Sequence, residues 1–223
     1  MKTDRQIRDE VEAELDWDPS FDSREVGVAV KDGIVTLSGH VNAFPDRWAA
    51  QKAAQSVADV KAIANEIQVK LPFDVKRSDT EIAAAALNAI KSNESIPAAH
   101  LKLTVRDGWL TVEGHVNWRY QSNAVDTAVR AVHGVKGVEN LIVIKPLAVN
   151  VSAASVKTKI ESAFQRHAHR DAKKIRVTVD EGVVTLEGEV PSWQEREDAE
   201  SAAWAAPGIS RVDDRLVVKP WPI

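Results

Sequence analysis

One motif of eleven residues occurs three times in this chain, and the repeat limits the fold more than any other feature of the sequence. The copies read KDGIVTLSGHV at residues 31–41, RDGWLTVEGHV at 106–116 and DEGVVTLEGEV at 180–190. Successive copies are therefore separated by 75 and 74 residues. Solenoid repeats are shorter, on the order of 20 to 50 residues, whereas this period can hold a complete small domain. The chain of 223 residues is thus predicted to contain three similar domains, at 1–72, 76–146 and 150–220.

Each repeat begins with the pattern of an amphipathic helix. Apolar residues recur at four-residue spacing, which places them on one face of a helix. These residues are Ile7, Val11 and Leu15, then Ile82, Ala86 and Ile90, then Val156, Ile160 and Phe164. The helices are preceded by Thr3, Ser78 and Ser152, which are favourable N-cap residues. Ser78 and Glu81 also have the spacing of a capping box.

A β-hairpin is predicted after each helix. In the first repeat Asp32 and Gly33 can supply the positive φ angles of a two-residue turn. Such a turn places Val30 opposite Val35, and period-two alternation gives the hairpin one apolar and one polar face. The apolar face should be buried, and the polar face should contact solvent.

An alanine-rich helix and a last strand complete each repeat. We expect the helices at residues 46–58, 122–132 and 194–205. The last strands carry a polar residue in mid-run, at Asn65, Asn140 and Asp214, for which we expect a structural role as the cap of a nearby backbone amide. The order helix–strand–strand–helix–strand predicts an α+β fold, with a three-stranded sheet covered on one face by two helices.

This combination of motifs resembles the BON domain, a bacterial domain named for osmotic-stress and nodulation proteins. The resembling motifs are the Asp-Gly turn, Thr-Leu-x-Gly-x-Val, the alanine-rich helix and Pro-Gly-Ile-x-x-Val, and the resemblance covers nearly the whole chain in three tandem copies. The structural glycines of the family correspond to Gly33, Gly39, Gly108, Gly114, Gly134, Gly182, Gly188 and Gly208. The first copy departs from this pattern, with Asp59 where the others have Gly134 and Gly208. The resemblance implies a protein that binds phospholipid or membrane surfaces and that is not an enzyme.

Composition excludes several kinds of site. The chain has no cysteine, so disulfides and thiolate chemistry are excluded. The net charge of −4 argues against nucleic acid as a partner. We expect no metal or other cofactor, because His167 and His169 would point to different faces of a helix. The N-terminal segment lacks the apolar core of a signal peptide, and no window is long enough to span a membrane, so we expect a cytoplasmic protein, peripheral to the inner membrane.

The aromatic residues of the second repeat are candidates for a binding surface. Trp109 follows the hairpin turn on the polar face of its sheet, and Trp118, Arg119 and Tyr120 follow the second strand at its far end. These residues either pack between domains or form an apolar patch for lipid or a partner protein. In contrast, Trp17, Trp48 and Trp204 are predicted to be core residues.

A basic segment of the third repeat is a second candidate. Its basic residues are Lys157, Lys159, Arg166, Arg170, Lys173, Lys174 and Arg176. Three interpretations remain open. The segment is a solvated helix face, or it contacts an anionic phospholipid surface. In the third interpretation it binds the acidic first helix of another molecule in a head-to-tail homo-oligomer.

The sequence therefore predicts a non-catalytic, stress-associated binding protein whose ligand is phospholipid or a membrane surface. The alternative is a soluble oligomeric scaffold or interaction protein, with a cavity for small molecules.

Overall fold

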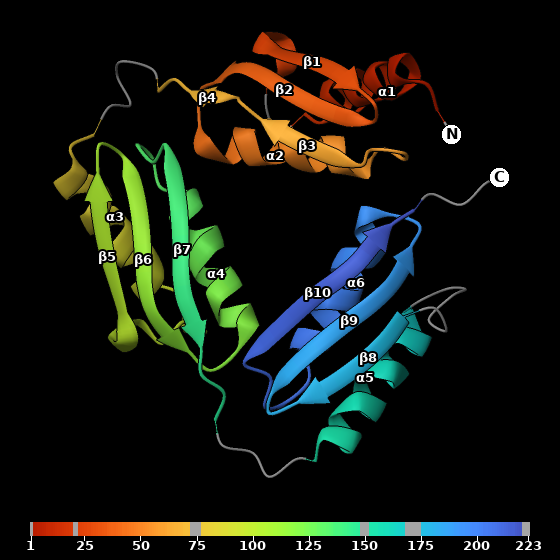
Figure 1. The fold of residues 1–223 in the computed structure, drawn as a ribbon. Helices are drawn as coiled ribbons and strands as arrows, with labels where there is room; N and C mark the ends of the chain where they lie inside the picture. Colours follow the sequence, from red (N-terminus) through yellow and green to blue (C-terminus); the bar gives the residue numbers. More distant parts are fainter. Residues whose placement is uncertain (1, 20–21, 72–76, 148–151, 168–174, 220–223) are drawn as a thin grey trace. The chain divides into compact units, whose positions relative to one another are not determined.

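The computed structural model describes residues 2–19, 22–71, 77–147, 152–167 and 175–219, and Figure 1 shows them coloured along the sequence. Three small α+β domains follow one another along the chain, as predicted, and each is described here by itself. In every domain two helices cover one face of a small sheet, and the other face is open (Figure 1).

The first domain has its strands in the order β1-β2-β3. Its elements are α1 (Asp4–Trp17), the 3-10 turn η1 (Ser23–Glu25), β1 (Val26–Lys31), β2 (Ile34–Val41), α2 (Phe44–Ser56), β3 (Ala62–Asn65) and β4 (Gln68–Val69). Strands β1 and β2 form the antiparallel hairpin, and β3 and β4 are both parallel to β2. The last strand is interrupted after Asn65, whose Oδ1 accepts a hydrogen bond from the N–H of Ile67 at 3.2 Å.

The second and third domains repeat this topology with an unbroken last strand. The second contains α3 (Asp79–Lys91), the 3-10 turn η3 (Ala98–His100), β5 (Leu101–Arg106), β6 (Trp109–Val116), α4 (Arg119–Arg130) and β7 (Gly137–Ile144). The third contains α5 (Ala153–His167), β8 (Ile175–Asp180), β9 (Val183–Val190), α6 (Trp193–Trp204) and β10 (Arg211–Val218). The strand order is β5-β6-β7 in the second domain and β10-β9-β8 in the third.

The core of each domain lies between the helices and the covered face of its sheet. All nine apolar residues predicted on the first helices are buried, with at most 4% of their surface exposed. The predicted hairpin register is also confirmed, because Val30 lies opposite Val35. Burying one aliphatic side chain contributes about 1.5–3 kcal/mol. These short helix stripes therefore account for a large part of the stability of each domain.

Helix capping follows the sequence closely. Ser78 and Glu81 form the predicted capping box, and Thr3 forms a second one with Gln6. The hydrogen bond from the Ser78 hydroxyl lowers the pKa of Glu81 below its usual value. The second helices begin one to three residues earlier than predicted. At α6 the reason is the side chain of Ser192, which accepts from the N–H of Glu195 and so fixes the start of the helix at Trp193.

At two positions, Gly114 and Asp59, the backbone has a positive φ angle, which limits the residue types that fit. Gly114 has a φ of 133°, and a Cβ there would lie 2.0 Å from the carbonyl oxygen of His100, so a side chain is sterically excluded. Asp59 stands where the other repeats have glycine, yet it adopts a φ of 70° and forms the same turn. Aspartate tolerates this left-handed region better than most residues. In addition, the Asp59 carboxylate accepts a hydrogen bond from the main-chain N–H of Lys2 at 2.7 Å.

The prediction that Trp17 and Trp48 are core residues is wrong. Trp17 is 83% exposed, because it lies two residues beyond Leu15 and therefore off the buried stripe of α1. Trp48 is 45% exposed, since α2 turns Ala50 and Ala54 toward the sheet instead. Trp204 is half-buried and packs against the core of the third domain, as predicted.

Candidate functional site

The open face of the sheet in the second domain is the candidate site. Side chains alternate along a strand, so every second residue of β5, β6 and β7 points away from the helices. Three large apolar residues, Trp109, Leu141 and Val143, are about half exposed on this open face. Several exposed apolar side chains on one face of a sheet are typical of an interaction surface.

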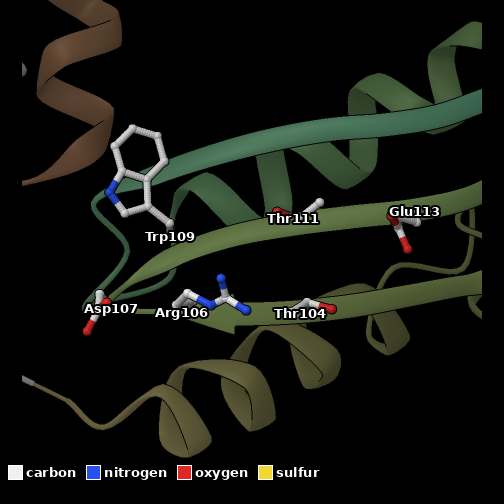
Figure 2. A pocket seen from close by; sticks show the side chains of 6 residues that line it. All are labelled: Thr104, Arg106, Asp107, Trp109, Thr111 and Glu113. Carbon is white, nitrogen blue, oxygen red and sulfur yellow. The ribbon is translucent and has the colours of Figure 1, made fainter.

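Trp109 is placed by the hairpin turn and by a glycine on the neighbouring strand. It is the first residue of β6 and lies opposite Arg106 on β5. The six-membered ring of its indole lies against Gly137 at the start of β7, since a Cβ at Gly137 would be only 2.3 Å from Cζ3 of Trp109. The absence of a side chain at Gly137 therefore allows the indole to lie across the sheet edge (Figure 2).

A shallow depression of about 570 Å³ lies beside the indole. Figure 2 shows its lining residues, which are Thr104, Arg106, Asp107, Trp109, Thr111 and Glu113. Thr104 lies opposite Thr111 in the hairpin, and the Thr111 hydroxyl donates to Glu139 on β7 at 3.4 Å. The lining thus combines an aromatic ring, two hydroxyls, one guanidinium group and two carboxylates.

The turn before Trp109 is held by the first helix of the domain. The carboxylate of Asp79, at the start of α3, accepts hydrogen bonds from the N–H groups of Asp107 (2.8 Å) and Gly108 (2.9 Å). On the other side, Nζ of Lys136 donates to the carbonyl oxygen of Asp107 at 3.0 Å. We call these three hydrogen bonds the turn contact. Because it fixes the backbone two residues before the indole, it limits the orientations available to Trp109.

The first domain has the same turn contact and the third domain lacks it. In the first domain Asp4 accepts from the N–H groups of Asp32 and Gly33, and Lys61 donates to the carbonyl oxygen of Asp32. The equivalent positions in the third domain are Ala153 and Ser210. Of these two, Ser210 donates a hydroxyl hydrogen bond to the carbonyl oxygen of Gly182, and Ala153 has no side-chain acceptor.

The other aromatic candidates of this domain lie away from Trp109. Trp118 precedes α4, and Arg119 and Tyr120 are its first two residues. Trp118 and Arg119 are partly buried, whereas Tyr120 is exposed. The seven residue steps of β6 between Trp109 and Val116 correspond to about 23 Å at the rise of a β-strand. The structure therefore does not bring the two groups into one site.

The basic segment of the third domain does not form one continuous face in the described residues. Lys157 and Lys159 are exposed on α5, and Lys157 forms an ion pair with Glu161 at 3.8 Å. Arg176 is instead on the open face of the sheet, because the next residue, Val177, is buried under the helices. The side chains of Arg166, Arg170, Lys173 and Lys174 lie outside the described residues.

The acidic helix α1 is the partner predicted for that segment. Several of its acidic side chains instead form ion pairs or hydrogen bonds within the first domain. Glu10 pairs with Lys2, and Asp9 pairs with Arg8 at 2.7 Å. Asp4 accepts the two hydrogen bonds of the hairpin turn described above.

The open sheet faces of the three domains differ in chemistry. In the third domain the charges on this face pair with one another, since Arg215 contacts Asp213 at 2.7 Å and Glu187 at 3.5 Å. In the first domain small residues such as Ala29 and Ala62 occupy much of the face.

The sequence analysis did not identify Arg106, Thr104, Thr111 and Glu113 as site residues. Strand alternation and the hairpin register are sufficient to place them on the same face as Trp109, so the sequence does contain a signal for them.

Two of the polar residues in the middle of the last strands, Asn65 and Asp214, have the structural role predicted for them. Oδ1 of Asp214 accepts from the N–H of Leu216 at 2.9 Å, and Oδ2 accepts from Nε of Arg196 on α6 at 2.7 Å. Asn65 likewise binds Arg47 on α2, through its Oδ1 and its main-chain oxygen. This residue therefore fixes the second helix to the sheet.

Neither a metal cluster nor a membrane-spanning segment is present in the part of the chain that the structure describes. No group of three or more His, Asp or Glu side chains there is arranged to hold a metal ion. Similarly, no helix among these residues is long and apolar enough to cross a membrane.

Comparison with known proteins agrees with the repeat. The BON domain pattern matches residues 3–70, 78–146 and 152–220. Osmotically-inducible protein Y of Escherichia coli (strain K12) is 27% identical over 144 residues, which cover 61% of this chain and 70% of that protein.

Among solved structures, CdsD, a structural protein of the type III secretion system of Chlamydia trachomatis, aligns with 97% of this chain and 93% of its own. The identity is 12% and the TM-score is 0.28. The periplasmic domain of PrgH aligns with 88% of this chain and 96% of its own, at 10% identity and a TM-score of 0.22. These TM-scores are too low to show a shared fold. The three matched segments together span nearly the whole chain, which therefore belongs to the BON domain family and carries three tandem copies of the domain.

Proposed function

We propose that this protein is a non-catalytic, stress-associated protein that binds the surface of phospholipid membranes through the open sheet face of its second domain. The observation that carries the proposal is Trp109, which is 54% exposed on a rigid sheet and beside a polar depression. Tryptophan favours the boundary between headgroups and acyl chains, because its ring is apolar and its N–H can donate a hydrogen bond. Family membership and the osmotically inducible relative support the assignment to stress.

The distribution of charge favours the second domain over the other two. Residues 76–146 contain nine basic and seven acidic residues. By contrast, residues 1–72 contain nine basic and thirteen acidic residues, and residues 150–220 contain eleven and twelve. Membranes that contain anionic lipids attract basic surfaces and repel acidic ones. The second domain would therefore approach such a surface first, and we place this event, as part of the proposal, at the cytoplasmic face of the inner membrane.

Co-sedimentation with vesicles tests the proposal. We expect the wild-type protein to sediment with vesicles of mixed bacterial phospholipids, and Trp109→Ala to weaken this binding about tenfold, which corresponds to roughly 1.4 kcal/mol. Trp17→Ala is the matched control, because Trp17 is an exposed tryptophan of the first domain and is not on an open sheet face. Absence of sedimentation with any vesicle, or equal loss in both variants, would contradict the proposal.

The mass of the protein in solution tests the alternative, a soluble oligomeric scaffold. In that alternative the protein forms a defined oligomer without lipid, and the double substitution Lys157→Glu and Lys159→Glu dissociates it. A monomer by light scattering would contradict the scaffold and leave membrane binding intact.

A further inference from the structure

The depression beside Trp109 carries charges of both signs that have no partner within the described part of the chain. There, the side chains of Arg106, Asp107 and Glu113 form no hydrogen bond or ion pair. The open face of the third domain is different, because its Arg215, Asp213 and Glu187 neutralise one another. The charges of the second domain are therefore available to a ligand.

The sign of these charges disfavours a simple anion. Two carboxylates and one guanidinium line the depression, and Lys102 lies opposite Glu113 on the same open face, so charges of both signs meet there. A phosphate group alone would gain from Arg106 but would be repelled by Asp107, its neighbour in the chain. A ligand that carries both a phosphate and an ammonium group would complement both signs.

The arrangement of the residues suits such a zwitterion. Asp107 is at the hairpin turn, two residues before the exposed indole, and the face of an indole attracts cations. Arg106 lies directly opposite Trp109 in the hairpin, and Thr104 and Thr111 form the next row of the same face (Figure 2). The guanidinium group can bind a phosphate through two parallel N–H donors, and the Thr104 hydroxyl can donate to one of its remaining oxygens.

We propose that this depression binds the phosphoethanolamine headgroup of a membrane phospholipid. The ammonium group lies over the indole of Trp109 and faces the carboxylate of Asp107. The phosphate lies at the guanidinium group of Arg106 and the hydroxyl of Thr104. Leu141 is exposed on the same open face and offers an apolar contact that a free headgroup would not use. The ligand is therefore a lipid at a membrane surface. The inference rests on the proposed membrane binding and names its ligand, which differs from the anionic lipid expected from the sequence.

The test compares two sets of phosphatidylcholine vesicles, one containing phosphatidylethanolamine and the other the same mole fraction of phosphatidylglycerol. We expect the wild-type protein to bind the phosphatidylethanolamine vesicles several-fold more tightly at physiological salt. Arg106→Gln should weaken this binding several-fold. Arg176→Gln, on the open sheet face of the third domain, is the matched control and should leave it unchanged.

Asp107→Asn separates this proposal from general attraction between the protein and anionic lipid. Asparagine tolerates the positive φ of 52° at this position, so the turn is retained. If the ammonium group is recognised, loss of the carboxylate weakens binding to phosphatidylethanolamine vesicles. If only net charge matters, the same change strengthens binding to phosphatidylglycerol vesicles and leaves the other set unaffected.

The outcomes of the vesicle experiment distinguish the headgroup assignment from the more general proposal of membrane binding. Preference for phosphatidylglycerol, or equal binding to both sets, overturns the headgroup assignment but leaves membrane binding in place. Binding to neither set overturns both. Soluble phosphoethanolamine is the last arm: we expect millimolar concentrations to compete only weakly. If it instead saturates the protein, with a change in tryptophan fluorescence, while phosphatidylethanolamine vesicles do not bind, the lipid assignment is overturned.

Discussion

The indole of Trp109 occupies the position that a side chain at residue 137 would need, because a Cβ on Gly137 would lie 2.3 Å from its Cζ3. At the equivalent places the first domain pairs Ile34 with Ala62, and the third pairs Val183 with Arg211. The glycine thus accompanies the large aromatic ring and is replaced where the opposite residue is smaller. This relationship fixes where the exposed indole lies on the sheet.

Gly137→Ala should displace the indole. Overpacking of a core costs about 1–3 kcal/mol, but Trp109 is half exposed and can move outward, so we expect a loss of stability below that range. Tryptophan fluorescence should change, and vesicle binding should weaken several-fold. In the background of Trp109→Ile the alanine should have no such effect, since that pair reproduces Ile34 and Ala62 of the first domain. An equal effect of Gly137→Ala in both backgrounds would contradict the steric explanation.

Asp79→Ala should loosen the turn that carries Trp109. It removes the acceptor of the N–H groups of Asp107 and Gly108. Because this contact is only part-buried, we expect a cost of about 1 kcal/mol, and hydrogen exchange at those two amides should become several-fold faster. Asp79→Asn keeps one acceptor oxygen and should have an intermediate effect. Thr80→Ala, on the exposed side of the same helical turn, is the control, and the prediction fails if it alters exchange at these amides to the same extent.

These residues also explain how much of the structure could be predicted from the sequence. Helix stripes, caps and hairpin turns depend on residues close in sequence, so the spacing of Ile82, Ala86 and Ile90 was sufficient to place α3. The hydrogen bond that the N–H of Gly108 donates to Asp79 joins residues 29 positions apart. In the sequence, an aspartate at the start of a helix is already explained by the helix dipole, so it gives no sign of this second contact. The contact of Trp109 with Gly137 depends on how β7 lies beside β6, which no hairpin turn fixes.

Nearness in sequence was misleading for the charged candidates of the third domain. Lys157 and Arg176 belong to one basic run, but the first is on a helix that covers the sheet and the second is on the open face. The side chains that line the depression in the second domain instead come from two strands and the turn between them. A candidate surface is therefore better predicted from strand alternation and register than from local charge density.

Asp214→Ala should destabilise the third domain more than Asp214→Asn does. Asp214 is mostly buried and accepts both from Arg196 and from the N–H of Leu216. Removing it leaves a part-buried guanidinium and an amide without their acceptor, at a cost of about 2–3 kcal/mol. Asparagine restores the amide contact, as Asn65 does in the first domain. Hydrogen exchange of the β10 amides measures the difference, and equal exchange in both variants would show that the amide contact contributes little.

Grafting the turn contact onto the third domain should stabilise it. Ala153→Asp with Ser210→Lys introduces the carboxylate and the ammonium group that the first two domains have at these positions. The aspartate would accept from the N–H groups of Glu181 and Gly182, whose φ angles of 42° and 80° resemble those of the other two turns. We expect a gain of about 1–2 kcal/mol, measured as slower hydrogen exchange at these amides and in β8. Ala154→Asp is the matched control, because it adds the same charge to the first turn of α5 at a position one residue further from the N-cap. If Ala154→Asp slows exchange at the turn as much as Ala153→Asp does, the gain comes from the helix dipole and not from hydrogen bonds to the turn.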